Sequence, residues 1–359
     1  METEKLEHWN DASPPLIISG PCSAESEKQV LETAQALAKL HGISVFRAGV
    51  WKPRTRPGDF EGQGLKALSW LKKATRETGL KTAVETGLPE HVKACLDHGI
   101  DIIWIGARTA VSPFAIQDIA KELKGQDLPV MVKNPVNADL DLWIGAMERI
   151  NEAGIKKIIA VHRGFYTYKP GRFRNDPLWE MPIELRRRIP GLPIVCDPSH
   201  ICGKKECIRE IAQKALNLGF DGLMIESHIR PGDACTDAAQ QLSPAELSSL
   251  LQMLVVRDND KPDDCLQELE KLRSLIDKTD EDLLRILSER HEIVKQVARI
   301  KREYNQPAFQ PERWRKVLED RVRSGIRLGL DTAMVKAIME QIHRDSVKNQ
   351  SDFLENDAG

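Results

Sequence analysis

The chain has 359 residues, enough for about two domains at roughly 150 residues each. Apolar residues make up 41% and charged residues 30%, and this composition excludes a disordered or collagen-like polypeptide. The 52 Lys and Arg against 54 Asp and Glu give a net charge of −2, so no general positive field draws the chain to nucleic acid or a membrane surface. Any anion binding must therefore be local.

The cysteines and the N-terminus indicate the compartment. The seven cysteines are an odd number without a CxxC pair, which is not a disulfide framework. The stretch METEKLEHWND is acidic and lacks an apolar h-region, and nowhere do about 18 consecutive apolar residues occur. We therefore expect a cytoplasmic protein that is neither secreted nor embedded in a membrane.

Glycine and proline divide the chain in two. Residues 1–264 hold 20 of the 23 Gly and 18 of the 20 Pro, leaving three and two for the last 95 residues. Between the two parts, Val256 to Asp264 is a charged, Pro-containing stretch with little to bury, which is typical of a linker. We expect domains at 1–255 and 265–359, joined by a linker at 256–264.

The first part alternates short apolar runs with helical spacers. There are eight runs: LIISG, VFRAG, KTAVET, IIWIG, PVMVKN, IIAVHRG, IVCDPSH and GLMIESH. Eight β/α units in about 250 residues predict a closed (β/α)₈ TIM barrel, with an open doubly wound sheet as the alternative. The barrel is favoured because the runs lead into reactive or charged residues, which a barrel gathers at one mouth. These residues are Cys22, Arg47 with Lys52, Glu85, Arg108, Lys133, Arg163, His200 and Glu226.

The last part is predicted to be all helical. No Gly or Pro interrupts Leu266 to Glu303, and its apolar residues recur at i, i+3, i+4 and i+7. The stripe comprises Leu272, Leu275, Ile276, Leu283, Ile286, Leu287, Ile293, Val294, Val297 and Ile300. Two shorter helices are expected around Glu312–Ser324 and Thr332–Leu354. Because so long a helix cannot bury its stripe alone, we expect a helical bundle that forms a homodimer.

Positive charges gather at the predicted barrel mouth. Arg47, Lys52, Arg54, Arg108, Lys133 and Arg163 all lie at strand ends or in the loops that follow them. Arginines offer bidentate forks and lysines a point charge, so this pocket suits a substrate with more than one anionic group.

A second set at the same mouth has the donors of a metal site. Cys22, His200, Glu226 and Asp237 supply sulfur, nitrogen and oxygen, a mixture that suits Mn²⁺, Fe²⁺, Co²⁺ or Zn²⁺ better than Mg²⁺ or Ca²⁺. Of these ions, Mn²⁺ is our first expectation.

The motifs GPCSAES, FRAGVWKPRT, IGAR, DPSH, IESH and TDAAQQLSP, in this order, resemble the type I 3-deoxy-D-arabino-heptulosonate 7-phosphate (DAHP) synthases of the branch related to octulosonate-phosphate synthases. The resemblance implies that the four donors bind the metal. It implies that phosphoenolpyruvate is held by Arg47, Lys52, Arg108, Lys133 and Arg163. Arg54 and Thr55 of KPRT would then bind the phosphate of erythrose 4-phosphate.

The residues fit the chemistry that this resemblance implies. An enol-phosphate carbon attacks an aldehyde that a metal polarises, and Lys52 or Lys133 can move a proton. A Schiff-base aldolase using Lys133 is a chemical alternative that leaves the metal set unexplained. Asn134 stands where many relatives have an Arg, which bears on how erythrose 4-phosphate is bound.

Basic residues interrupt the apolar stripe of the long helix. Arg290 and Lys301 are 11 residues apart, about three turns, so they face one site, whereas Arg273 points about 100° away and would reach such a site from a partner subunit. Buried cations need partners, and a bound dianion is the natural one. On the final helix, Ser346 and Gln350 form an i, i+4 pair that can hydrogen bond into the same cavity.

The run LRSLIDKTDEDLLRILSERHEIVKQVARIK, then PER, then DSVKNQ resembles the all-helical chorismate mutases. The resemblance implies that chorismate is bound by Arg273, Arg290, Lys301, Arg313, Ser346 and Gln350 and rearranges to prephenate without a covalent step. Gln310 and Trp314 depart from the Asp and Glu frequent there. The rival interpretation is a non-catalytic helical binding and dimerisation module on a synthase. In either case we expect prephenate or chorismate, bound to this domain, to inhibit the barrel.

Overall fold

The computed structural model describes residues 1, 3, 15–54, 56–168, 171–256 and 263–355. The chain divides into two compact units, Met1–Arg257 and Asp258–Gly359. Among the described residues, none of the helices has the length and apolar character needed to cross a membrane. The six described cysteines are all free thiols.

The first unit is a closed barrel of eight parallel strands, as predicted. Each strand pairs with the next and β8 pairs with β1, for example Ser19 with Ile225, and this closure excludes the open sheet. The strands are β1 Leu16–Gly20, β2 Ile43–Arg47, β3 Lys81–Thr86, β4 Ile102–Ile105, β5 Val130–Lys133, β6 Ile158–His162, β7 Ile194–Cys196 and β8 Gly222–Glu226.

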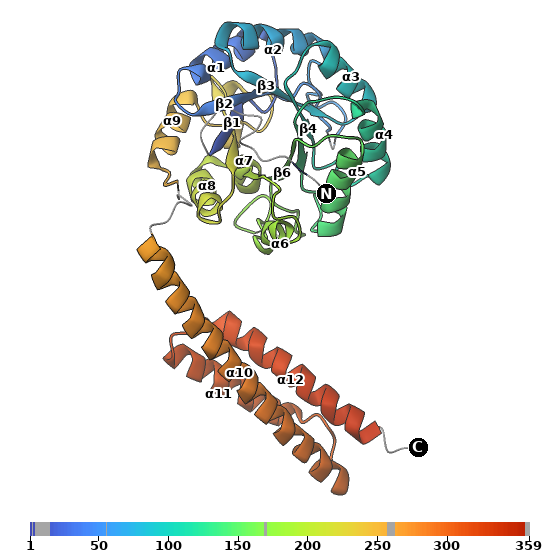
Figure 1. The fold of residues 1–359 in the computed structure, drawn as a ribbon, viewed down its shortest axis with the longest axis vertical. Coiled ribbons are helices and arrows are strands. Elements are labelled where there is room, and N and C mark those ends of the chain that lie inside the picture. The colour runs from blue at the N-terminus through green and yellow to red at the C-terminus, as the bar shows by residue number, and fades with distance from the viewer. Residues whose placement is uncertain (2, 4–14, 55, 169–170, 257–262, 356–359) are drawn as a thin grey trace. The chain divides into compact units, whose positions relative to one another are not determined.

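Nine α-helices of the described chain belong to the barrel unit, and Figure 1 shows them around the strands. They are α1 Glu27–Ala38, α2 Leu65–Thr78, α3 Pro89–Asp97, α4 Pro113–Leu123, α5 Leu140–Glu152, α6 Glu180–Arg188, α7 Pro198–Cys202, α8 Ile208–Asn217 and α9 Pro244–Met253. Local signals set several helix starts: Ser112 caps α4, Asp139 caps α5, and Ser243 with Glu246 forms a capping box on α9.

The strands bury side chains on both faces, which explains why they are nearly continuous apolar runs. Leu16 and Ile18 belong to the cluster inside the barrel, whereas Ile17 packs in the larger cluster between strands and helices. Trp104 and Met131 also lie inside. The barrel interior is thus a packed core that supports the residues at the strand ends.

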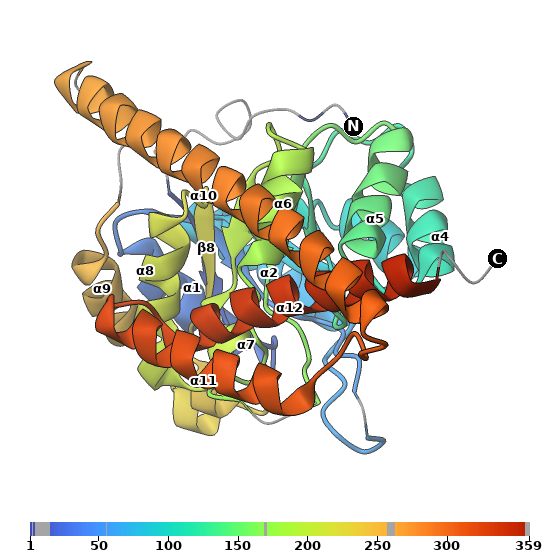
Figure 2. The same ribbon diagram turned by 90° about the horizontal axis from the view of Figure 1, so that it is seen from below.

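The second unit consists of three helices: α10 Asp263–Glu303, α11 Pro311–Arg327 and α12 Thr332–Glu355. Asp263 and Asp264, expected in the linker, belong to α10, and the rest of that linker from residue 257 lies outside the described residues. α10 ends where Asn305 adopts φ 51° and Gln306 N donates to Lys301 O at 2.7 Å. α12 packs against both other helices, and Figure 2 shows α11 beside it.

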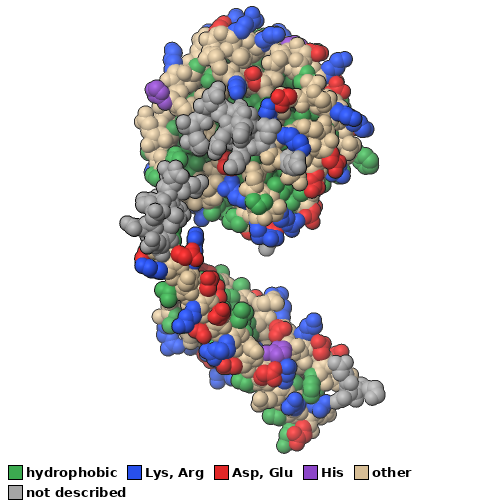
Figure 3. All heavy atoms as spheres, viewed as in Figure 1, with side chains coloured by type: hydrophobic (Ala, Val, Ile, Leu, Met, Phe, Trp, Pro, Cys, Tyr) green, Lys and Arg blue, Asp and Glu red, His purple; other side chains and the backbone are tan. Residues whose placement is uncertain are grey.

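The apolar stripe of α10 differs from expectation. Only Val294 and Ala298 of the described part of this helix are buried apolar residues, while Leu275 is 61% and Ile293 59% exposed. Hydrophobic side chains therefore lie among charged ones on the surface of the helical unit (Figure 3). Three helices of one chain do not cover the stripe.

Candidate active sites of the two units

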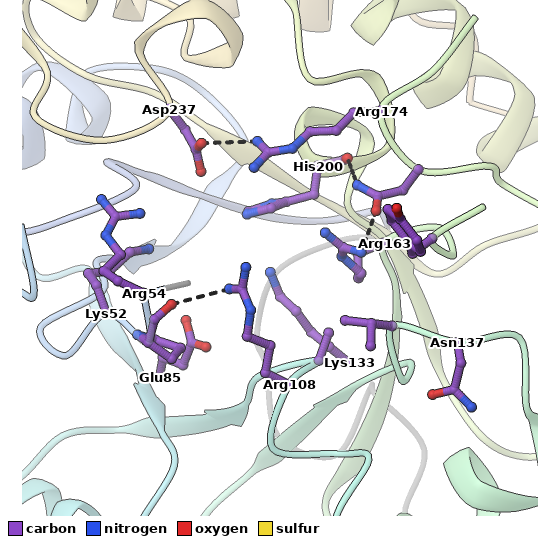
Figure 4. Close-up of a pocket in the computed structure, with 15 residues that line it drawn as sticks. Lys52, Arg54, Glu85, Arg108, Lys133, Asn137, Arg163, Arg174, His200 and Asp237 are labelled. Atoms are coloured by element: carbon purple, nitrogen blue, oxygen red, sulfur yellow. Dashed lines mark hydrogen bonds and ion pairs between the residues drawn. The ribbon is translucent and has the colours of Figure 1, made fainter. Parts of the chain in front are cut away.

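The ends of the strands surround a cavity of about 540 Å³ (Figure 4). Six cations line it: Lys52, Arg54, Arg108, Lys133, Arg163 and Arg174. Glu85 and Asp237 are the only carboxylates among the described lining residues. Because cations outnumber carboxylates, the cavity is suited to an anionic ligand.

The four predicted metal ligands come together at one wall of the cavity. Donor atoms of Cys22, Glu226 and Asp237 lie within 4.8 Å of one another, with Cys22 Sγ 3.4 Å from Asp237 Oδ2. His200 Nε2 is 3.6 Å from Glu226 Oε1. That buried Oε1 accepts no hydrogen bond, so it remains available as a metal ligand. The donor set fits a divalent transition metal.

Neighbouring groups and burial set the orientation of His200 and the protonation states of His200 and Cys22. His200 Nδ1 lies 2.8 Å from Asp197 Oδ2, which leaves Nε2 toward Glu226, the arrangement usual for a metal-binding histidine. Burial lowers the pKa of His200, favouring the neutral imidazole. Burial raises the pKa of the Cys22 thiol to about 12, so metal binding must release its proton.

Arg47, predicted to bind substrate, is not among the residues that line the cavity and lies buried beside Glu226, with its Nε and Nη1 free of hydrogen bonds. Its side chain is 1% exposed, with Nη2 3.3 Å from Glu226 Oε1 and the guanidinium 4.8 Å from the centre of the Trp104 ring. From there Arg47 balances the charge of Glu226 and orients it.

Lys133 lines the cavity and is anchored by a buried carboxylate. Its Nζ lies 2.7 Å from Asp197 Oδ2 and 5.9 Å from the centre of the Trp104 ring. Burial opposes ionisation of Asp197, but His200 and Lys133 outweigh it and hold the pKa of Asp197 well below its usual range. An ammonium group paired with a carboxylate is not a nucleophile, so this geometry favours charge binding over Schiff-base formation.

The other cations approach the cavity from several loops. Lys52 Nζ lies 3.1 Å from Cys22 Sγ, and Arg108 Nη1 donates to Pro53 O at 3.3 Å. Neutral oxygens hold two guanidiniums: Phe60 O accepts from Arg54 Nε and Asn175 Oδ1 from Arg163 Nη1. Burial lowers the pKa of Arg163 to about 10, which leaves it charged at neutral pH. Thr55 lies outside the described residues.

Two glycines of the motifs make room for this arrangement. A Cβ on Gly20, at φ +150°, would lie 2.1 Å from Arg47 O, so glycine lets the chain before Cys22 approach β2. A Cβ on Gly106 would lie 2.0 Å from Glu85 Oε1. The glycines of GPCS and IGAR therefore bring neighbouring strand ends together.

Three residues of the site were missed by sequence reasoning: Arg174, Asp197 and Gln240. Arg174 Nη1 lies 3.0 Å from both Asp237 Oδ1 and Gln240 Oε1. Gln240 Nε2 in turn donates to Glu226 Oε2 at 2.7 Å. Asp197 and Gln240 lie within the DPSH and TDAAQQLSP motifs, which could have indicated them. Arg174 lies far beyond the end of β6, in the long segment before α6, so its sequence position carried no such signal.

The helical unit gathers a smaller polar cluster. Arg290 Nη1 donates to Ser346 Oγ at 2.6 Å, and Gln350 Nε2 donates to Ser346 O at 3.1 Å. Lys301 Nζ donates to Ala308 O at 2.6 Å. Gln350 Oε1 is buried without a hydrogen bond.

The other residues singled out in the helical unit do not bond to this cluster in the described chain. Arg273 is exposed, with Nη1 3.6 Å from Glu270 Oε2, and Arg313 is exposed on α11. Gln310 stands directly before α11, and the Trp314 ring stacks on His343. The described chain thus brings together Arg290, Ser346 and Gln350, but not Arg273.

Comparison with known proteins decides what these sites belong to. The model of the DAHP synthetase I family matches residues 7–260. This chain belongs to the DAHP synthetase I family. The model of the type II chorismate mutases matches residues 272–351, so the chain is a bifunctional enzyme in which a DAHP synthase barrel precedes a chorismate mutase unit. The two activities place it in aromatic amino acid biosynthesis through the shikimate pathway.

Relatives of this DAHP synthase support the assignment. Phospho-2-dehydro-3-deoxyheptonate aldolase of Thermotoga maritima is 31% identical over 236 residues, covering 66% of this chain and 68% of the relative. A 2-dehydro-3-deoxyphosphooctonate aldolase of Acidithiobacillus ferrooxidans is 26% identical over 281 residues, covering 71% and 95%. A crystal structure of the Thermotoga maritima DAHP synthase has a TM-score of 0.62 at 29% identity, covering 70% of this chain and 72% of that one. The type I family is generally metal-dependent, in keeping with the donor cluster of this barrel.

Proposed function

We propose that the barrel condenses phosphoenolpyruvate with D-erythrose 4-phosphate, releasing DAHP and phosphate. One observation carries the proposal: six cations line a cavity together with His200 and Asp237, and Cys22 and Glu226 lie close behind these two donors. The cations match a phosphate and a carboxylate on one substrate and a phosphate on the other.

Each side chain of the barrel site then has a role that follows from its position. Arg47, Lys52, Arg108, Lys133 and Arg163 hold phosphoenolpyruvate, while Arg54 with Thr55 holds the aldehyde's phosphate. Cys22, His200, Glu226 and Asp237 would hold a divalent metal, Mn²⁺ in our proposal and Fe²⁺, Co²⁺ or Zn²⁺ as alternatives, and the bound metal would polarise the aldehyde. C3 of phosphoenolpyruvate bonds to the aldehyde carbon, water adds at C2, and the C2–O bond to phosphate breaks. Lys133 is placed to supply a proton from its ion pair with Asp197.

The aldehyde is the part of this assignment that most needs a direct test. Octulosonate-phosphate aldolases are among the relatives, and their condensation takes a longer sugar phosphate. The purified full chain, loaded with Mn²⁺, should consume phosphoenolpyruvate far faster with erythrose 4-phosphate than with arabinose 5-phosphate. A preference for the five-carbon sugar would overturn the proposed substrate.

For the helical unit we infer that chorismate binds at Arg290, Lys301, Ser346 and Gln350 and rearranges to prephenate. The pair of Arg290 and Ser346 and the unpaired Oε1 of Gln350 support this. Chorismate disappearance, measured on the same preparation as condensation, tests it. Condensation without chorismate turnover would instead favour a non-catalytic binding module.

We infer that the unit works as a homodimer, because Leu275, Ile286 and Ile293 are each more than half exposed on one chain. A second copy would cover them and bring its Arg273 to the site. Sedimentation of the full chain should report a dimer, and Ile293→Asp should shift it to the monomer. A wild-type monomer that turns over chorismate would overturn this point.

We also propose feedback: prephenate bound to the helical unit inhibits the barrel. A coupling of about 1 to 3 kcal/mol would change affinity roughly 5- to 150-fold. Condensation kinetics with and without prephenate test it, and Arg290→Ala should abolish the inhibition. Inhibition that persists in that variant would place the effector elsewhere.

A further inference from the structure

The departure at Trp314 has a structural counterpart on the facing helix. The Trp314 ring lies parallel to that of His343, with ring centres 3.8 Å apart and an angle of 4° between the planes. Phe309 contacts the same imidazole at 5.7 Å and 54°. Two aromatic rings therefore fix the orientation of His343.

His343 shares its helix face with the chorismate-binding residues proposed above. It precedes Ser346 by three residues and Gln350 by seven, spacings that align side chains along one side of α12. Lys301 approaches the same place, because its Nζ bonds to Ala308 O and the next residue is Phe309. The imidazole thus belongs to the cluster around Arg290 and Lys301.

The ring has unused hydrogen-bonding capacity there. His343 Nε2 is buried without a hydrogen-bond partner, and so is Gln350 Oε1. Burial lowers the pKa of His343, and the charges of Arg290 and Lys301 lower it further, so the ring is neutral at pH 7. A neutral imidazole can bond to an uncharged polar group beside two cations without adding a third charge.

Chorismate carries two carboxylates, an ether oxygen and one ring hydroxyl. The residues of the proposed site account together for the two carboxylates and the ether oxygen. The ring hydroxyl is then left without a binding residue. Gln310 and Trp314 stand at positions that are frequently acidic in the chorismate mutases.

We propose that His343 Nε2 hydrogen bonds to the ring hydroxyl of chorismate, and that Trp314 positions the imidazole for this contact. The proposal rests on the proposed chorismate site and adds a specificity-determining residue to it. The hydroxyl takes no part in the bonds made and broken, so His343 selects and orients the substrate.

The test compares chorismate with an analogue that lacks the ring hydroxyl, using the full chain. The wild type should prefer chorismate by about 10- to 100-fold in kcat/KM, as expected for a hydrogen bond whose loss leaves a buried group unpaired. His343→Leu should slow chorismate to about the rate of the analogue and so lose the preference. His343→Gln should keep much of it, since the amide nitrogen occupies nearly the position of Nε2.

His291→Leu is the matched control, because His291 is a partnered histidine of the same unit, with Nδ1 3.5 Å from Asn349 Nδ2. It should retain the wild-type preference, and circular dichroism checks that each variant remains helical. A full preference in His343→Leu would overturn the proposal while leaving chorismate turnover, and with it the proposed function, intact. If the wild type binds chorismate without turning it over, the proposed rearrangement fails, and the same comparison in Kd decides the role of His343.

Discussion

The two units of this chain both gather cations, but they balance the charge differently. In the barrel, Lys133 and Arg47 face the buried carboxylates of Asp197 and Glu226 at 2.7 and 3.3 Å. In the helical unit, Arg290 and Lys301 are held by a hydroxyl and a carbonyl oxygen. The barrel thus pairs two of its cations with carboxylates and holds Arg54 and Arg163 by neutral oxygens, whereas both helical cations are held by neutral oxygens.

The difference follows from burial. Lys133 and Arg47 lie at strand ends that the closed sheet removes from water, and a nearby carboxylate lowers the cost of burying their charge. The helical cations are only partly buried, so water shares their charge and no carboxylate is required. We infer that the barrel site is organised before substrate arrives, while the helical site is completed by its ligand and a second subunit.

The largest expected effect comes from removing a proposed metal ligand, which should impair the reaction of the barrel and not that of the helical unit. Cys22→Ala should lower condensation at least about 10³-fold, because a Lewis acid contributes several kcal/mol to such a transition state. Chorismate rearrangement should be unchanged, since no donor is shared. Cys95→Ala, which removes another fully buried thiol, is the control. Equal losses in the two variants would contradict the metal assignment.

A loss of about 10²- to 10³-fold in chorismate turnover is expected for Arg290→Ala, the size usual for removing one preorganised donor. The unit should stay helical, because Arg290 has a hydroxyl rather than a buried carboxylate as its partner. Arg285→Ala, on the same helix and paired with Glu289 at 2.7 Å, is the control. Circular dichroism and chorismate disappearance are the measurements. Undiminished turnover in the Arg290 variant would remove this residue from the site.

A smaller effect is expected when a residue that orients the proposed metal ligands is replaced. Arg174→Gln should weaken Mn²⁺ binding about 10- to 100-fold, the usual cost of losing a residue that orients a ligand. The reason is that Arg174 holds Asp237 directly and Glu226 through Gln240. Metal titration of the full chain measures the affinity. Arg172→Gln, which removes an exposed pair with Glu210, should leave it unchanged, and equal affinities in both variants would show that Arg174 gives no support.

The last prediction concerns the stability of the barrel at acid pH, where no effect on either reaction at neutral pH is expected. Burial lowers the pKa of His162 to about 3, against an ordinary value of 6.5. Between these values the unfolded chain takes up a proton that the folded barrel does not, so stability falls as pH falls, by at most about 1.4 kcal/mol per pH unit. Above pH 6.5 the histidine contributes no pH dependence.

His162→Phe should therefore flatten the loss of protection of β6 between pH 6.5 and 4, measured by hydrogen exchange against the wild type at each pH. Phe165, Trp179 and Phe220 surround the ring and can accept a phenyl group. Parallel losses in the two proteins would mean that His162 is not the group responsible.

Much of the fold could be predicted because it follows from local sequence patterns. The eight apolar runs are the eight strands, and the absence of Gly and Pro from Leu266 to Glu303 predicts the long helix. The donors at the mouth could be predicted because strand ends of a barrel converge by topology. Arg174 could not, since it is carried by the long segment between β6 and α6, whose path depends on packing against the rest of the barrel.

The sequence by itself determined the order of elements, the division at about residue 256 and the residue types at the strand ends, because periodicity and motif spacing are local properties. Tertiary structure alone decided that Arg47 is buried against Glu226, and that His343 stacks on Trp314. It also decided that the stripe of α10 stays exposed on one chain. Burial and ion pairing depend on which surfaces meet in space, and residues far apart in the sequence acquire those neighbours only when the chain folds.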